Sequence, residues 1–243
     1  MAGAQSTSSE AARSCEWWIE KIDGGICLMT SQGPFSVYRR ASALTGCGWD
    51  AQAASTLFAT RPVRDILLLG MGGGTVARLC RQLHPTARIV AVEAEAKIIT
   101  LARKRFGIDN LGLEVVHAQA EDYVRAHGGS FDAVVDDAWP FVNAQARAAV
   151  QDTTWHVRLA DRLREGGSLA INLLSNEKSA GGRHRAAAQM RRCFVHLREI
   201  RFANRATTVL VGGNRLICAR AARERMRTAC GAEALLGMSL RSI

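Results

Sequence analysis

Short apolar runs alternate with helix-length segments through the middle of the chain. The runs have the length and composition of strands buried on both faces, and they lie at 66–70, 87–93, 113–118, 131–137 and 167–174. Helices are expected near 75–83 and over 96–107, where Gly107 ends the second one. A series of this kind predicts an α/β protein with a Rossmann-like, doubly wound, mostly parallel sheet.

The chain changes character after this series. Two strand-like segments, 195–203 and 207–211, follow each other with no helix between them. Gly212-Gly213-Asn214 is typical of a hairpin turn, which would lead into a further strand at 215–219. We therefore expect the sheet to end in an antiparallel hairpin.

The N-terminal part has a strand pattern of its own. Apolar and polar positions alternate around turn signals at Asp23-Gly24-Gly25 and Gly33-Pro34, which predicts a small β hairpin or meander. Asp50 is then expected to cap a helix that Pro62 terminates. The predicted division is a disordered tail at 1–14, the β segment at 15–48, the main domain at 49–230 and a tail at 231–243.

Composition narrows the class of protein. With 243 residues, 48% of them hydrophobic, the chain can bury one large core. The N-terminus has no signal-peptide pattern and no segment approaches ~18 consecutive apolar residues, so we expect a cytoplasmic protein without a membrane partner. Seven scattered cysteines without a CxxC pair argue against a disulfide framework and against a zinc site.

The net charge of +10 comes from the C-terminal half. Residues 158–227 hold 16 Lys and Arg against 5 Asp and Glu, whereas the rest of the chain holds 16 against 17. Such a half can bind nucleic acid or an anionic substrate, or it can be a solvated arginine face. No aromatic residue interleaves RHRAAAQMRRCF, so nucleic acid is the less favoured partner.

The strongest chemical signal is ILLLGMGGGTVARL followed by IVAVEAEA. A strand that runs into Gly70, Gly72, Gly73 and Gly74 lets backbone approach a ligand, and the helix from Thr75 would point its amides there. Glu93 ends the next strand, where a carboxylate can accept hydrogen bonds from both ribose hydroxyls. Together these residues predict an adenosine site. For NAD the third glycine of the fingerprint would fall at Thr75, so S-adenosylmethionine is the better fit.

Five segments together resemble the spermidine synthase-like branch of the class I S-adenosylmethionine-dependent methyltransferase fold. They are LLLGMGGGTVARL, VAVEAEAKIITLARKRFG, EVVHAQAEDYV, FDAVVDDAWP and LREGGSLAINLL. The resemblance implies that Gly70, Gly72 and Gly74 line the methionine and ribose side of the cofactor. It implies that Glu93 holds the ribose, and that Gln119 and Ala120 lie at the adenine edge.

The departures from this family concern the acceptor. Where the family has Asp after the triple glycine to hold the ammonium of decarboxylated S-adenosylmethionine, this chain has Thr75. The neutral hydroxyl of Thr75 suits a cofactor that retains its own carboxylate, so Thr75 is a candidate cofactor-binding residue. In DDAWP, Asp137 matches the first acid of the family's DSSDP pattern, while Trp139-Pro140 replaces the region of the second. Tyr38 matches the family's tyrosine, but Arg39-Arg40 stands where an acid is expected. A polycationic acceptor should avoid such a site.

The chemistry of transfer assigns candidate roles. Displacement at a sulfonium carbon needs an uncharged or anionic nucleophile, and a carboxylate can accept the proton of an amine. Asp137 is the first candidate for this base and also borders the cofactor, and Asp136 is the second. Trp139 can stack on the substrate or serve as packing. By resemblance, Tyr38 and Gln32 line the acceptor mouth, and Tyr38 is a further catalytic candidate.

The leading hypothesis is methyl transfer from S-adenosylmethionine to a small, non-polycationic acceptor, with no metal. Three alternatives stay open: aminopropyl transfer from decarboxylated S-adenosylmethionine, intramolecular attack on the cofactor as in a cyclase or lyase, and nucleic-acid binding or modification through the basic half. A homodimer through the N-terminal β segment also stays open.

Overall fold

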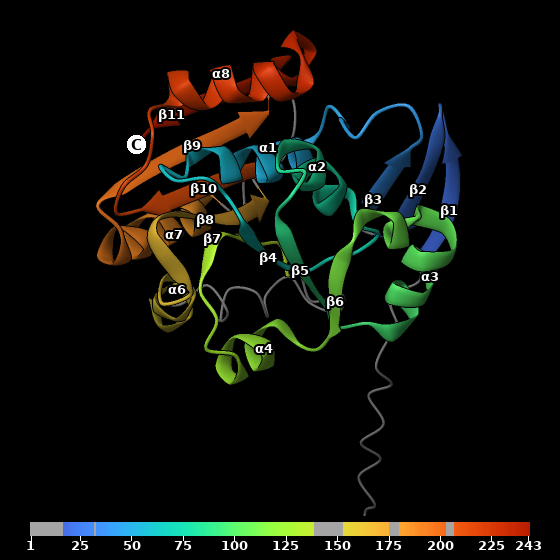
Figure 1. The fold of residues 1–243 in the computed structure, drawn as a ribbon, viewed down its shortest axis with the longest axis horizontal. Coiled ribbons are helices and arrows are strands. Elements are labelled where there is room, and N and C mark those ends of the chain that lie inside the picture. The colour runs from blue at the N-terminus through green and yellow to red at the C-terminus, as the bar shows by residue number, and fades with distance from the viewer. Residues whose placement is uncertain (1–16, 32, 139–152, 175–179, 203–206) are drawn as a thin grey trace, which may run out of the picture.

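The computed structural model describes residues 17–31, 33–138, 153–174, 180–202 and 207–243. The predicted disordered tail at 1–14 lies outside the described residues. Among these residues, one large sheet has eight strands in the order β11-β9-β10-β8-β7-β4-β5-β6 (Figure 1). Its strands are β4 (Asp65–Leu69), β5 (Arg88–Glu93), β6 (Leu113–His117), β7 (Phe131–Asp136), β8 (Leu163–Leu174), β9 (His196–Phe202), β10 (Thr207–Gly213) and β11 (Met238–Ser242).

Strand direction follows the sequence pattern. The pairs β4–β5, β5–β6, β4–β7 and β7–β8 are parallel. The pairs β8–β10, β9–β10 and β9–β11 are antiparallel. The predicted Rossmann-like α/β class, with a mostly parallel sheet that ends in an antiparallel hairpin, is thus confirmed.

Helices cover both faces of this sheet. They are α1 (Gly48–Ala54), α2 (Thr75–Leu83), α3 (Ala96–Phe106), α4 (Ala120–Ala126), α6 (Thr153–Ala160), α7 (Ala180–Cys193) and α8 (Ala219–Cys230). Helices α1, α2, α3 and α8 pack on one face, and α4, α6 and α7 pack on the other. In Figure 1, α8 lies above the central strands and α4 lies below them.

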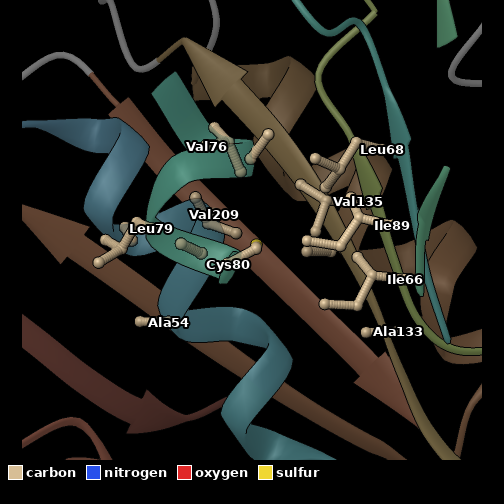
Figure 2. Close-up of a cluster of buried hydrophobic side chains, with 14 of the residues drawn as sticks. Ala54, Ile66, Leu68, Val76, Leu79, Cys80, Ile89, Ala133, Val135 and Val209 are labelled. Carbon is tan, nitrogen blue, oxygen red and sulfur yellow. The ribbon is translucent and has the colours of Figure 1, made fainter. Parts of the chain in front are cut away.

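Successive side chains of the buried strands point to opposite faces of the sheet and pack into two different hydrophobic clusters. Ile66 and Leu68 of β4 belong to the cluster under α1 and α2, whereas Leu67 and Leu69 belong to the cluster under α4, α6 and α7. Figure 2 shows the first cluster, in which the β4 side chains meet Val76 and others from α2. Because both faces are covered, the strand pattern is continuously apolar rather than alternating.

The N-terminal segment forms a separate antiparallel sheet, as predicted. Its order is β1-β2-β3, from β1 (Trp17–Ile22), β2 (Gly25–Thr30) and β3 (Gly33–Arg39). The turn at Asp23-Gly24 joins the first two strands, and Gly24 has a φ of 66°. Gly33-Pro34, predicted as a turn, instead begins β3. This sheet lies beside α3 at one end of the molecule (Figure 1).

The predicted strand at 215–219 is wrong. Gly212 and Gly213 belong to β10, where a side chain at Gly212 would collide with Phe194. These glycines therefore admit close packing of the α7 end rather than a turn. Both edges of β10 are already paired, with β8 and β9. The apolar segment after β10 instead contacts the 3-10 turn at Ser55–Phe58, where the Ile217 amide donates to the Phe58 carbonyl at 3.0 Å.

Two further expectations differ from the structure. Asp50 lies in the first turn of α1 rather than at its N-cap, which is Cys47. Its buried carboxylate accepts hydrogen bonds from the Thr45 and Gly46 amides before the helix. The segment 231–243, expected as a tail, contains a 3-10 turn and then β11, which extends the sheet beyond β9.

Candidate functional site

The candidate site lies at the carboxyl ends of the parallel strands. β4 ends at Leu69, and the glycine loop from Gly70 to Gly74 leads directly into α2. Gly70, Gly72 and Gly74 have φ values of 85°, 53° and 82°, a region that favours glycine. A side chain at Gly70 would also collide with the Asp137 carbonyl oxygen. The glycines are thus required by backbone conformation and by the close approach of the β7 end.

The amides of this loop are directed at the protein. The Gly72 amide donates to Glu93 Oε2 at 2.8 Å, and the Gly73 amide donates to Ser36 Oγ at 2.8 Å. The Gly74 amide donates to the Met71 carbonyl at 2.9 Å. These three amides precede α2, so the expectation that the helix from Thr75 points its own amides at a ligand stays a prediction. A loop whose amides are used in this way is poorly suited to the pyrophosphate of a dinucleotide.

Glu93 is fixed at the centre of the site. Its side chain is 4% exposed, and Oε1 accepts a hydrogen bond from the Glu95 amide at 3.0 Å. Burial raises the pKa of Glu93, and the amides of Glu95 and Gly72 act in the opposite direction. Each carboxylate oxygen carries a second lone pair, so the group can still accept from hydroxyls. The arrangement therefore fits a diol such as a ribose.

Thr75 joins the glycine loop to the N-terminal sheet. Its hydroxyl accepts a hydrogen bond from the Val37 amide at 2.8 Å and donates to the Val37 carbonyl at 2.9 Å. The residue is 4% exposed. Because both hydrogen-bonding capacities go to β3, the hydroxyl holds the N-terminal sheet on the loop. Together with the Ser36–Gly73 bond, this contact is called the β3 clamp below.

The adjacent acids Asp136 and Asp137 separate onto opposite faces of the sheet. Asp136 is 1% exposed and accepts a hydrogen bond from Trp155 Nε1 at 3.0 Å. Asp137 is partly exposed, and its Oδ1 accepts from Asn172 Nδ2 at 2.6 Å. The Asp137 amide donates to the Leu69 carbonyl at 2.8 Å, which holds this residue next to the glycine loop. Asp136 serves the packing of α6, whereas Asp137 lies at the site.

Asn172 was not among the predicted site residues. It is 6% exposed and lies near the carboxyl end of β8, beside Asp137. A signal for it exists in the sequence: the run LAINLL holds this single polar residue within an apolar strand. Burying an amide is costly unless it is hydrogen-bonded, so such a residue marks a specific contact.

The segment predicted at the adenine edge lies close to Glu93. The Ala118 amide donates to the Glu93 carbonyl at 3.1 Å, which ties the end of β6 to the end of β5. Gln119 follows as the N-cap of α4 with an exposed side chain, and Ala120 is buried. The structure therefore brings the glycine loop, Glu93, Gln119 and Asp137 to one edge of the sheet.

Tyr38 is held by a different part of the fold. Its ring lies under the Arg78 guanidinium, 4.4 Å from the ring centroid, and its centroid is 6.5 Å from that of Phe106. These contacts come from α2 and the end of α3, whereas Asp137 follows β7. Gln32 and Trp139, the other predicted acceptor residues, lie outside the described residues.

Many arginines of the basic half support the fold. Arg225 of α8 donates to the carbonyls of Leu57 and Ala59 at 3.0 and 2.8 Å, and Arg223 donates to that of Leu240 at 3.2 Å. Arg201 and Arg241 form ion pairs with the buried Glu199. Part of the positive excess therefore holds the C-terminal elements together.

Comparisons with known proteins agree with this geometry. Residues 66–167 match the family described as "Methyltransferase domain". A segment of 141 residues is 27% identical to a probable polyamine aminopropyl transferase of Bifidobacterium longum, and 78 residues are 37% identical to a polyamine aminopropyltransferase of Chromobacterium violaceum. A probable spermidine synthase from Corynebacterium glutamicum superposes with a TM-score of 0.70 at 16% identity, over 98% of this chain and 91% of that one. The chain has the class I methyltransferase fold, and it is similar in sequence and structure to spermidine synthases and polyamine aminopropyltransferases.

The sequence likeness is confined to part of each protein. The two matches cover 58% and 31% of this chain, and 31% and 30% of the curated relatives. The spermidine synthase-like resemblance and the fold are thus confirmed.

The described residues hold neither a group of side chains suited to a metal nor a membrane-spanning helix. None of their His, Cys, Asp and Glu side chains gather in threes in a way that could hold a metal ion. Within those same residues, no helix is both long and apolar enough to cross a bilayer.

Proposed function

We propose that this protein is an S-adenosylmethionine-dependent transferase that methylates a small, non-polycationic acceptor. The observation that carries the proposal is the fixed Glu93 carboxylate, bound by the Gly72 amide at 2.8 Å in a loop whose amides serve protein acceptors. A ribose-binding acid without a phosphate cradle suits a nucleoside-type cofactor better than a dinucleotide.

The residues at the sheet edge fit this cofactor. Glu93 would hold the ribose hydroxyls, Gln119 and Ala120 would border the adenine, and the glycine loop would admit the methionine part. A glutamine carbonyl can accept from the adenine amino group. When bound, the cofactor supplies an electrophilic carbon on a sulfonium.

Asp137 would be the base that accepts a proton from the acceptor. An alkylamine with a pKa near ~10 is mostly protonated at neutral pH, and only its neutral form can attack carbon. Asp137 follows β7, where open parallel sheets bind ligands, and its carboxylate would orient the acceptor and accept its proton. Asp136 is a poor base because its carboxylate is buried against Trp155.

The preference for methyl transfer rests on Thr75. An aspartate at this position would attract the ammonium of decarboxylated S-adenosylmethionine, but the Thr75 hydroxyl is neutral and is bound to Val37. The intact cofactor carries its own carboxylate and needs no such anion. Arg39-Arg40, at the end of β3, would also repel a polyamine.

Aminopropyl transfer is the second candidate. The observation in its favour is that both curated relatives are named as polyamine aminopropyl transferases. It requires an acceptor site rebuilt from other residues, because Thr75 and Trp139-Pro140 stand where the family has acids. Intramolecular attack on the cofactor uses the same cofactor site and differs only in its product.

Calorimetric titration of the full chain tests these candidates in parallel. The ligands are S-adenosylmethionine, decarboxylated S-adenosylmethionine, methylthioadenosine and NAD. Preference for the intact cofactor supports methyl transfer or cyclisation, which product analysis then separates. Preference for the decarboxylated form supports aminopropyl transfer and contradicts the argument from Thr75. Preference for NAD overturns the cofactor class altogether.

A pair of variants tests the ribose contact. Glu93→Ala should weaken cofactor binding about a hundredfold or more, because two hydrogen bonds to a charged group are lost. Glu95→Ala is the matched control: it removes an exposed carboxylate two residues away and keeps the backbone amide that binds Glu93. Equal binding by Glu93→Ala and the wild type would contradict the assignment of Glu93.

A further inference from the structure

We infer that Asn172 is a positioning residue for the Asp137 carboxylate, a role that rests on the proposed function of Asp137. The inference starts from strand register. β7 and β8 run parallel with Asp136 opposite Ile171, so Asp137 and Asn172 are the next residues along each strand. Alternation then puts both side chains on the same face of the sheet. Their hydrogen bond, at 2.6 Å between Nδ2 and Oδ1, follows from this placement.

The backbone of Asn172 has little freedom to move. β8 lies between β7 and β10, and Asn172 is paired with Val209 of β10. Its neighbours Ile171 and Leu173 are 0% and 5% exposed. An amide anchored in a central strand can hold the plane of the carboxylate, and hence the direction of Oδ2, more precisely than a loop residue can.

The contact also selects a protonation state. The Asn172 Nδ2 group is a donor only, so its bond to Oδ1 favours the ionised carboxylate. A base for an amine must be ionised before the acceptor arrives. Asn172 therefore supplies two properties at once: a fixed direction and a charged form. It does so without a positive charge, which would repel a cationic acceptor.

The test follows the titration of the Asp137 carboxyl itself. Aspartate labelled with carbon-13 at Cγ is incorporated into the full chain, and the Asp137 signal is identified by its loss in Asp137→Asn. In Asn172→Leu the midpoint of this signal should move to higher pH by about one unit, since one donor to the charged form is lost. Ser168→Ala is the control, because Ser168 is a buried polar residue of the same strand, four positions earlier.

A second variant keeps the test decisive if Asn172→Leu does not fold. Asn172→Asp keeps the shape of the side chain but puts a carboxyl beside Asp137, and two such groups cannot both ionise easily. The pair should then retain one proton about one pH unit or more above the wild-type midpoint. A midpoint unchanged to within a few tenths of a unit in the folded variant, for either substitution, overturns the role of Asn172.

Activity separates this inference from the proposed function. The probe is S-adenosylmethionine with n-butylamine, and release of S-adenosylhomocysteine is measured. A positioning role predicts that Asn172→Leu lowers kcat about tenfold while KM for the cofactor stays within about twofold. A shifted Asp137 titration without turnover in the wild type keeps the Asn172 contact and contradicts methyl transfer to small amines. Turnover in the wild type with an unshifted Asp137 titration in the Asn172 variants supports methyl transfer and contradicts the role of Asn172.

Discussion

His84 should make the folded state sensitive to mild acid. It caps α2 at its C-terminal end, and its Nε2 lies 2.8 Å from Thr56 Oγ1. That hydroxyl donates to the Ala53 carbonyl at 2.7 Å, so it accepts from His84, which fixes the tautomer with hydrogen on Nε2. Burial, and then the nearby Arg225 guanidinium, lower the pKa of His84 from 6.5 to about 4.

The sign and size of the effect follow from linkage. The unfolded chain binds a proton at His84 below about pH 6.5, whereas the folded chain resists it until about pH 4. The stability contributed by the neutral imidazole is therefore complete above pH 6.5 and is lost as the pH falls through this window. The loss amounts to about 2 kcal/mol by pH 5 and to about 3 kcal/mol below pH 4.

Urea unfolding followed by tryptophan fluorescence measures this loss. The free energy of unfolding is determined for the wild type and for His84→Gln at several pH values between 7.5 and 5. The buried Asp50 and Glu93, whose pKa values are raised by burial, titrate in both proteins and cancel in the difference. His196→Gln, at an exposed position, is the control. A difference between wild type and His84→Gln that is the same at every pH would refute the reasoning.

Two other predictions concern the β3 clamp and thiol reactivity. Thr75→Val should lower the free energy of unfolding by about 1–3 kcal/mol, because the amide and carbonyl of Val37 lose their partner, while Thr75→Ser should recover most of it. Urea denaturation of the two variants checks this, and a Thr75→Val protein as stable as the wild type would disprove the clamp. Cys218 should react before Cys80 and Cys230 with iodoacetamide at neutral pH. The Ala221 amide lowers the pKa of Cys218, and burial raises the pKa of Cys80 to about 12 and of Cys230 to about 11. Peptide mass mapping gives the order, and earlier labelling of Cys80 or Cys230 would contradict it.

The central elements could be predicted almost to the residue because their signals are local. The predicted helix at 75–83 is α2, and α3 ends before Gly107, whose φ is 62°. The buried run at 66–70 corresponds to β4 with a difference of one residue at each end, and the run at 131–137 corresponds to β7 with a difference of one residue at its C-terminal end. Buried apolar strands and the glycines that end helices can be recognised from neighbouring residues alone.

The predictions failed at residues whose structural role depends on a partner far away in the sequence. Nothing local to Thr75 reveals that Val37, 38 residues earlier, takes both sides of its hydroxyl. Asn172 gains its meaning only from Asp137 on the neighbouring strand. The predicted strand at 215–219 failed for the same reason, because the sequence does not tell that both edges of β10 are already filled.

The β3 clamp imposes an order on how this protein is made. Residues 33–39 leave the ribosome well before the loop at 72–75 that receives them, so the N-terminal sheet has no docking site when it is synthesised. It must wait, with Phe35 and Val37 uncovered, until β4 and the first turn of α2 have formed. The loop at 72–75 is therefore held both by one of the first segments of the chain and by Glu93, which is synthesised after the loop.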